Sequence, residues 1–138
     1  MVIRLALALC CALALPAAAA TQDEVNATLS ADPSIWGRLQ SAGLAWEIRR
    51  QCPDIGARDW AGRFFLLGIY NDARAYGFTR DQIRIFQRDD ALKERLRAEV
   101  SAYVQSRGAR LDDPETLCAL GRAEIAAGTE AGELLRAR

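Results

Sequence analysis

Cysteine carries the most reactive chemistry that this sequence offers. Cys10 and Cys11 lie in an apolar N-terminal run, and Cys52 and Cys118 lie in the body of the chain. The chain has no histidine, which excludes Ser-His-Asp and Cys-His catalysis. Cys52 and Cys118 alone are too few ligands for a zinc site. A metal site and a nucleophilic cysteine are therefore the weaker interpretations. A disulfide is favoured, although spacing alone does not fix the pairing.

Two glutamates are the next candidates for chemistry. Glu47 lies between two large apolar residues, and Glu124 falls at the edge of the apolar face of the last predicted helix. Two partly buried carboxylates can perform acid–base catalysis, as in glycoside hydrolysis. Buried charges more commonly pair, here with Arg49, Arg63 or Arg122. We favour the ion pairs and predict that the protein is not an enzyme.

Three acidic residues, Asp112, Asp113 and Glu115, lie close together near the last helix. They lack the twelve-residue loop pattern of a calcium site. Asp113 followed by proline is typical of a helix start, where the carboxylate caps the free backbone N–H groups. We therefore expect neither a metal nor a cofactor.

Aromatic residues gather in the middle of the chain, where nine of the ten lie between Trp36 and Phe86. Such a cluster can line a ligand groove, but aromatic side chains bury the most area and usually form the core. Trp36, Trp46 and Trp60 are the candidate ligand or partner surface. Trp36 follows a segment that we expect to be flexible, so it should keep some surface exposure.

The first twenty residues have the features of a secretory signal peptide. Arg4 supplies a positive charge, residues 5–15 form an eleven-residue apolar run, and Ala18 and Ala20 are the small residues of a cleavage site. The run is shorter than the roughly 20 residues that span a bilayer. We predict cleavage near Ala20 and a periplasmic or secreted protein that is not membrane-spanning, in a compartment where thiols oxidise.

Charge excludes one class of partner. The whole chain has 18 basic and 18 acidic residues, and removal of Arg4 with the signal peptide leaves 17 against 18, a net charge of −1. The charges are interleaved, without the basic patch that neutralises phosphates. We predict no nucleic-acid partner and expect an unknown envelope protein or ligand.

The pattern of apolar residues predicts an all-α fold. Residues 21–31 are polar and lack periodicity, which indicates a flexible leader. Apolar residues then recur at helical spacing between capping residues, prolines and glycines. The predicted helices cover residues 33–51, 57–76, 79–88, about 90–107 and 113–128, with a short final turn near 129–135. No segment alternates with the period of a strand, so we expect a single compact domain over residues 32–138, with about five helices in an irregular or orthogonal bundle.

The residues around Cys118 indicate a close contact between helices. Cys118, Gly121 and Ile125 share one helix face. Glycine costs a helix about 1 kcal/mol relative to alanine, so another helix, or the chain at Cys52-Pro53, should approach closely at Gly121. A Cys52–Cys118 disulfide would pin the first long helix to the last one. Closing this loop of 66 residues contributes at most roughly 4 kcal/mol.

Two stretches, "AWEIRRQCP" at residues 45–53 and "ETLCALGRAEIAAGTEAGELLRAR" at residues 115–138, carry a family resemblance. The positions that carry it are Glu47, Ile48, Arg49, Cys52, Pro53, Arg58, Cys118, Gly121, Glu124, Ile125, Gly132 and the terminal LLRAR. On these residues the chain, from about residue 32 to 138, resembles the domain-of-unknown-function 5333 family, small exported proteins of Gram-negative bacteria. The resemblance implies an all-helical exported domain with the same cysteine pair, and it implies no activity, cofactor or catalytic residue.

The glutamates and arginines near both cysteines suggest a local ion-pair network. We expect Arg49 or Arg58 to pair with Glu124 beside the disulfide, with Glu47 in the same buried region.

The expected function is a non-enzymatic structural or interaction domain in the periplasm. The alternative is a small binding or chaperone-like protein whose aromatic-lined groove takes a hydrophobic ligand or an unfolded segment. The least favoured hypothesis is a histidine-free hydrolase that uses Glu47 and Glu124. An exposed apolar patch or a pocket among the tryptophans would favour the groove binder. Two glutamates together in a cleft would favour the hydrolase.

Overall fold

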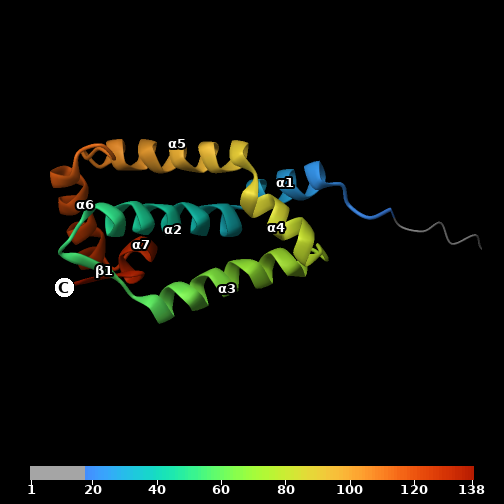
Figure 1. Ribbon diagram of the computed structural model, residues 1–138, viewed down its shortest axis with the longest axis horizontal. Helices are drawn as coiled ribbons and strands as arrows, with labels where there is room; N and C mark the ends of the chain where they lie inside the picture. Colours follow the sequence, from blue (N-terminus) through green and yellow to red (C-terminus); the bar gives the residue numbers. More distant parts are fainter. Residues whose placement is uncertain (1–17) are drawn as a thin grey trace, which may run out of the picture.

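The computed structural model describes residues 18–138, which contain seven helices and two short strands (Figure 1). The elements are α1 Gln22–Ala31, α2 Pro33–Gln51, β1 Ile55–Ala57, α3 Asp59–Ala75, α4 Arg80–Arg88, α5 Asp90–Ser106, α6 Pro114–Ala127, α7 Glu130–Glu133 and β2 Leu135–Ala137. The predicted signal peptide falls almost entirely on residues 1–17, outside the described residues. None of the helices in residues 18–138 combines the length with the hydrophobicity that crossing a bilayer requires.

The long helix α2 forms the centre of the fold. In Figure 1, α5 runs along one side of α2 and α3 runs at an angle along the other. Helices α6 and α7 also pack on α2, while α1 contacts both α2 and α4. The predicted helical fold is therefore confirmed, with seven helices in residues 18–138 in place of about five.

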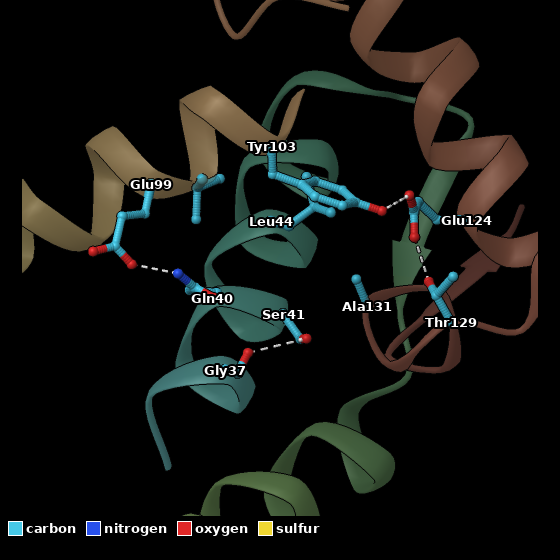
Figure 2. A pocket seen from close by; sticks show the side chains of 10 residues that line it. Gly37, Gln40, Ser41, Leu44, Glu99, Tyr103, Glu124, Thr129 and Ala131 are labelled. Atoms are coloured by element: carbon cyan, nitrogen blue, oxygen red, sulfur yellow. Dashed lines mark hydrogen bonds between the residues drawn. The ribbon is translucent and has the colours of Figure 1, made fainter. Parts of the chain in front are cut away.

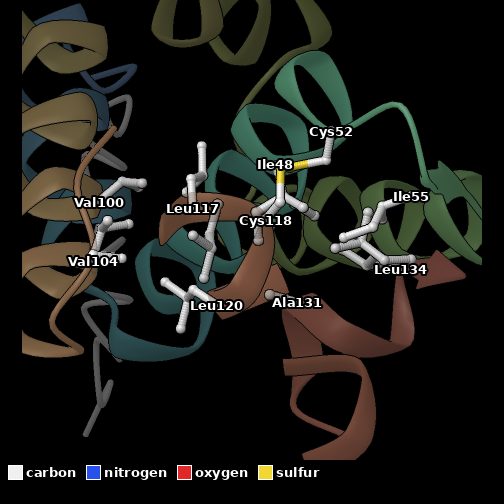
Figure 3. Packing of buried hydrophobic residues seen from close by; sticks show 14 residues of the cluster. Ile48, Cys52, Ile55, Val100, Val104, Leu117, Cys118, Leu120, Ala131 and Leu134 are labelled. Atoms are coloured by element: carbon white, nitrogen blue, oxygen red, sulfur yellow. A yellow bond between two sulfur atoms is a disulfide. The ribbon is translucent and has the colours of Figure 1, made fainter. Parts of the chain in front are cut away.

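Two apolar clusters hold the helices together. The first surrounds the disulfide and takes buried residues from α2, α5, α6, α7 and both strands (Figure 3). The second takes buried residues from α1, from α3, from α4 and from the first turn of α2. Phe65 of α3 packs against both clusters, so α3 bridges the two halves of the core.

The prediction of a flexible leader at residues 21–31 is wrong. These residues form α1, which begins with a capping box between Thr21 and Glu24. Val25 and Leu29, one helical turn apart, have no exposed surface and belong to the second cluster. Two large apolar residues are too few to show a helical period, yet their burial against the rest of the protein is enough to order the segment.

The small sheet is not predicted by the sequence. Strands β1 and β2 pair antiparallel, with Ile55 opposite Ala137 and Ala57 opposite Leu135. Three residues are too few to show a period of two. The pairing holds residues 135–137 against the segment that follows Cys52.

Most helix boundaries follow the predicted capping signals. Asp32 and Asp113, each followed by proline, accept hydrogen bonds from the first backbone N–H groups of α2 and α6. Thr79 and Gln82 form the predicted capping box of α4. Gly128 takes the left-handed conformation, with φ +62°, that ends α6.

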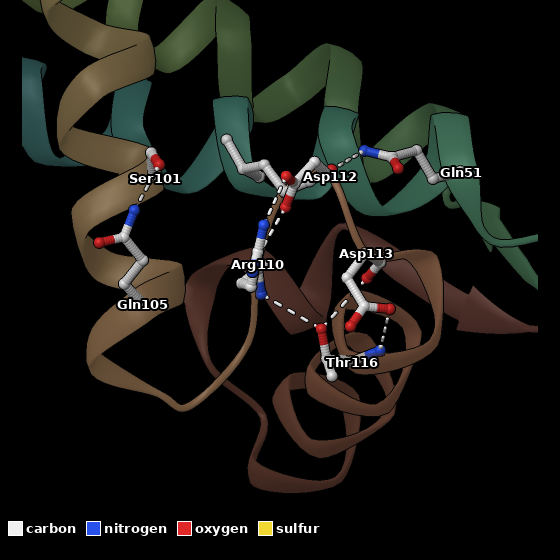
Figure 4. Close-up of polar contacts among 8 residues, drawn as sticks. Gln51, Ser101, Gln105, Arg110, Asp112, Asp113 and Thr116 are labelled. Carbon is white, nitrogen blue, oxygen red and sulfur yellow. Dashed lines mark hydrogen bonds and ion pairs between the residues drawn. The ribbon is translucent and has the colours of Figure 1, made fainter.

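The acidic residues between α5 and α6 bind groups of the chain itself (Figure 4). The guanidinium of Arg110 donates two hydrogen bonds, of 2.9 and 2.7 Å, to Asp112 and lowers the pKa of that carboxyl. The backbone N–H of Arg110 donates to the hydroxyl of Thr116 at 3.2 Å. Gln51 of α2 donates to the carbonyl of Leu111 at 2.9 Å. These bonds fix the start of α6 against the end of α2.

Candidate functional site

The structure joins Cys52 and Cys118 in the predicted disulfide, with their Cα atoms 5.5 Å apart. Cys52 ends α2 and Cys118 lies in the second turn of α6. A Cβ atom on Gly121 would lie 2.6 Å from Cγ2 of Ile48 and 2.8 Å from Cδ1 of Ile55. The predicted close approach at Gly121 is therefore confirmed, and it comes from α2 and from the chain just after Cys52.

The predicted ion pair between Glu124 and Arg49 or Arg58 is wrong. Arg49 stacks on the ring of Trp46, with its guanidinium carbon 5.8 Å from the ring centroid. Arg58 donates to the backbone carbonyl of Glu133 at 3.4 Å. Both arginines lie on the outer surface, because a long side chain at the edge of an apolar face can extend its charge into water.

Glu124 is 2 % exposed, and its partners are two neutral hydroxyl groups (Figure 2). The hydroxyl of Tyr103 donates to one carboxylate oxygen at 2.7 Å, and the hydroxyl of Thr129 donates to the other oxygen. Within residues 18–138, Glu124 forms no ion pair. An ionised carboxylate in this place is a buried charge without a counterion.

Glu47 lies in a different environment. It forms an ion pair of 2.6 Å with Arg50 and accepts a hydrogen bond of 3.4 Å from Gln51, both on its own helix. The expected arginine partner is therefore present, but it is Arg50. Glu124 lines a pocket, described below, that Glu47 does not line. The two glutamates therefore do not share a cleft, as the hydrolase hypothesis requires. Within residues 18–138, no three metal-ligating side chains come together.

A pocket of about 220 Å³ opens beside Glu124, between α2, α5, α6 and α7 (Figure 2). Its lining residues are Gly37, Gln40, Ser41, Leu44, Glu99, Val100, Tyr103, Glu124, Thr129 and Ala131. They include two glutamates and neither arginine nor lysine. We call this cavity the Glu124 pocket.

Hydrogen bonds shift the pKa values of two side chains of the Glu124 pocket, Tyr103 and Glu99. The bond to Glu124 raises the pKa of Tyr103, because a phenolate would face the carboxylate; burial adds to this increase, and Arg107 opposes it. Glu99 accepts a hydrogen bond of 2.6 Å from the indole N–H of Trp36, which lowers the pKa of Glu99. Near neutral pH, Tyr103 is therefore a neutral donor and Glu99 a charged acceptor.

Helix α7 positions Thr129 against Glu124. A Cβ atom on Gly132 would lie 2.0 Å from the backbone oxygen of Glu124, so only glycine lets α7 pack on the end of α6. The hydroxyl of Thr129 accepts from the backbone N–H of Gly132 at 3.1 Å and caps α7. The same hydroxyl donates its proton to the carboxylate of Glu124.

Tyr103 and Thr129 are the site residues that sequence reasoning misses. The sequence places Tyr103 in the apolar stripe of its helix and Thr129 at a cap. The available signal is the glutamate itself, because a buried carboxylate requires hydrogen-bond donors. The pattern does not say which of the neighbouring donors supply them.

The three candidate tryptophans do not form one surface. Trp36 is 7 % exposed and packs against Phe86 in the second cluster, with ring centroids 6.5 Å apart. The expectation that Trp36 keeps surface exposure is therefore wrong, because the segment before it is an ordered helix that belongs to the same cluster. Trp46 and Trp60 are exposed.

Helix α3 presents large apolar side chains to solvent. Trp60, Phe64 and Leu67 follow one another at intervals of four and three residues, so they share a helix face. Their exposed fractions are 71, 67 and 51 %. We call these three residues the α3 face.

A groove of about 330 Å³ lies next to the α3 face, between α2 and α3. Apolar residues that include Phe65, Leu66 and Leu134 line it together with Trp46. Three arginines also line it, namely Arg49, Arg58 and Arg63, with Asp59 as the one acidic lining residue. None of these arginines forms an ion pair within residues 18–138. We call this feature the α2–α3 groove.

A search of curated proteins and a search of solved structures find nothing similar. The sequence profile of a family of unknown function, DUF5333, matches residues 27–136. The match runs from α1 to β2 and includes the disulfide, Glu124 and the α3 face. It confirms the resemblance found in the sequence, and the chain therefore belongs to the DUF5333 family.

Proposed function

We propose that the protein is exported to the periplasm and acts there as a non-enzymatic interaction domain, which binds a partner protein through the α3 face and the α2–α3 groove. The exposure of the α3 face carries this proposal. Contiguous large apolar side chains on a surface are typical of interaction sites, because their burial releases about 25 cal/mol per Å².

The charges around the α2–α3 groove favour an acidic amphipathic helix as the partner segment. Arg49 and Arg63 stack on Trp46 and Trp60, at 5.8 and 5.3 Å from the ring centroids, and keep N–H groups free for a carboxylate. A helix can lay its apolar stripe in a groove of this kind. Acidic residues beside the stripe would then reach the arginines at its edge.

Photo-crosslinking tests the partner. A photoreactive residue in place of Phe64 is expected to couple to one protein, at a segment that is apolar on one side and acidic at its flanks. The same residue in place of Ile85, which is exposed on α4, is the matched control. Charge reversal at Arg63 should reduce the coupling. Equal coupling from both positions, or coupling to a basic segment, would contradict the proposal.

Export is supported by the features of residues 1–20 and by the disulfide, since disulfides persist in oxidising compartments. Cell fractionation followed by intact-mass measurement tests it. The expected product is periplasmic, lacks about the first twenty residues and has no free thiol. Full-length protein with reduced cysteines in the cytosol would be the contrary result.

The α2–α3 groove also supports a second candidate function, the binding of a small anionic amphiphile. A short-chain alkyl carboxylate, titrated while tryptophan fluorescence is followed, distinguishes the two. A saturable change that Gly62→Leu abolishes would favour the small ligand, because Gly62 lines the groove and a Cβ atom added to it would meet nothing within 4 Å. The absence of a saturable change favours the protein partner.

A further inference from the structure

We infer that the Glu124 pocket binds a small organic ammonium ion, a primary amine with a short apolar body. This site is separate from the α3 face and the α2–α3 groove. The inference therefore does not depend on the proposed partner protein.

The charge of the pocket favours a cation. Burial of an ionised carboxylate is unfavourable unless a positive charge or strong hydrogen bonds compensate it. Glu124 has two neutral donors, and a carboxylate has about four acceptor positions, so positions remain for further N–H groups. Glu99 adds a second carboxylate to the lining; it accepts hydrogen bonds from Trp36, from Gln40 of the same lining and from Arg95, with which it forms an exposed ion pair of 2.8 Å. An ammonium group would supply the positive charge that the lining lacks.

A third carboxylate lies close to the pocket. Glu130, at the start of α7, is within hydrogen-bond distance of the hydroxyl of Ser41, which lines the pocket, at 3.0 Å. Glu130 is exposed and lies outside the lining, so it adds a negative charge near the cavity and not within it. Negative groups in a cavity with poorly polarisable walls concentrate their field there and attract cations.

The remaining walls favour an apolar body of limited size. Leu44, Val100 and Ala131 supply aliphatic surface, and the ring of Tyr103 lies next to Glu124 (Figure 2). An aromatic ring also stabilises a nearby cation through its negative face. A cavity of about 220 Å³ is large compared with the roughly 10–15 Å³ of cavity volume that one water molecule requires, but it is too small for a peptide segment.

Gly37 provides a geometric indication that this space matters. It lies inside α2 and lines the Glu124 pocket, and a Cβ atom added to it would meet nothing within 4 Å. Glycine in a helix interior lowers stability by about 0.5–1 kcal/mol relative to alanine, and no neighbouring atom requires it here. The glycine does leave the side of the pocket open, as a ligand would need.

Calorimetric titration with n-butylammonium tests the inference at neutral pH. The controls are n-butanol, which has the same body without the charge, and butyrate, which has the opposite charge. We expect saturable binding of n-butylammonium alone. Chemical-shift changes in NMR spectra should concentrate on the residues of the Glu124 pocket.

Variants locate the binding. Gly37→Leu should abolish it by filling the pocket, whereas Gly62→Leu, an equally open helix glycine on α3, should leave it unchanged. Glu124→Gln should weaken it by about tenfold or more, because the charged acceptor is lost. Should Glu124→Gln fail to fold, Gly37→Leu carries the test alone.

Three results would overturn the inference. They are no saturable binding of n-butylammonium, an equal response to n-butanol or butyrate, and binding that Gly37→Leu leaves intact. The first two would identify Glu124 as a purely structural residue. The third would place the amine elsewhere on the protein.

Discussion

At the scale of the residue, the hydroxyl of Tyr103 makes the burial of Glu124 possible. It comes from α5, while Glu124 lies on α6 and its other donor, Thr129, begins α7. One carboxylate thus connects α6 to α5 and α7, whereas the disulfide connects α6 to the end of α2.

Tyr103→Phe should lower the free energy of unfolding by about 1–2 kcal/mol, because it leaves a buried carboxylate oxygen without its donor. Urea denaturation measures this. Tyr70→Phe is the matched control, since Tyr70 is a partly buried tyrosine of the second cluster that donates no hydrogen bond within residues 18–138. Equal losses in both variants would show that the bond to Glu124 is unimportant.

Because of the same hydrogen bond, we expect the free energy of unfolding to depend on pH in the alkaline range. The folded pKa of Tyr103 is raised above the ordinary tyrosine value of 10.0. Its contribution to stability is therefore complete below pH 10 and is lost as the pH rises through the raised value. The difference in unfolding free energy between wild type and Tyr103→Phe should shrink above pH 10. A difference that grows in alkali would contradict the assigned hydrogen bond.

Sequence reasoning at this scale succeeds where chemistry leaves few choices. With no histidine and two cysteines outside the apolar N-terminal run, a disulfide between Cys52 and Cys118 is the favoured interpretation. Glu124 has many possible partners, and helical periodicity gives the face of a residue without naming its neighbours. An arginine partner is therefore the reasonable prediction. It is wrong because the hydroxyl groups of Tyr103 on α5 and Thr129 at the start of α7 bind the carboxylate instead.

At the scale of the element, two glycines have opposite effects. Gly121→Ala should destabilise the protein by about 1–2 kcal/mol, because its Cβ would overlap Ile48 and Ile55, both fully buried. Gly62→Ala should stabilise it by up to about 1 kcal/mol through helix propensity, since nothing lies within 4 Å. Thermal melting of both variants provides the measurement. A stabilising Gly121→Ala would mean that α6 can move away from α2.

Helix α1 should be part of the cooperative core. Leu29→Ala should cost about 2–5 kcal/mol, because Leu29 has no exposed surface. Leu67→Ala, on the exposed α3 face, should change stability by less than about 0.5 kcal/mol. Urea denaturation compares them. An effect of Leu29→Ala as small as that of Leu67→Ala would restore the interpretation of this segment as a flexible leader.

The elements that sequence analysis identifies are those with strong local signals. Asp32, Thr79, Asp113 and Gly128 mark helix ends by their own side-chain or backbone chemistry. Helix α1 has its own capping box, between Thr21 and Glu24, but like the two strands it has too few apolar residues to show a period. These elements form because distant parts of the chain offer apolar surface or backbone partners.

At the scale of the whole molecule, the disulfide should supply a large part of the stability. Replacing both Cys52 and Cys118 by alanine should lower the free energy of unfolding by about 2–4 kcal/mol, because the bond closes a loop of 66 residues. Wild-type protein that is unfolded, reduced and refolded with its thiols kept reduced should show the same decrease in the free energy of unfolding. A reduced protein as stable as the oxidised one would show that helix packing alone holds the fold.

The helical fold class and the Cys52–Cys118 disulfide are predictable from sequence, but the arrangement of the helices is not. Periodicity identifies α3 as apolar on more than one side, which normally means a fully buried helix. In the structure only part of α3 is covered, and Trp60 and Phe64 remain in water. Whether such a helix is buried depends on how many neighbours the chain supplies, which a local pattern does not contain.

The position of the disulfide along the chain has a consequence for the order of assembly. Helices α3, α4 and α5 all lie between Cys52 and Cys118. During synthesis or translocation, the first thiol therefore emerges long before the second and waits unpaired while three helices follow it. The disulfide can therefore close only after all three of these helices have emerged.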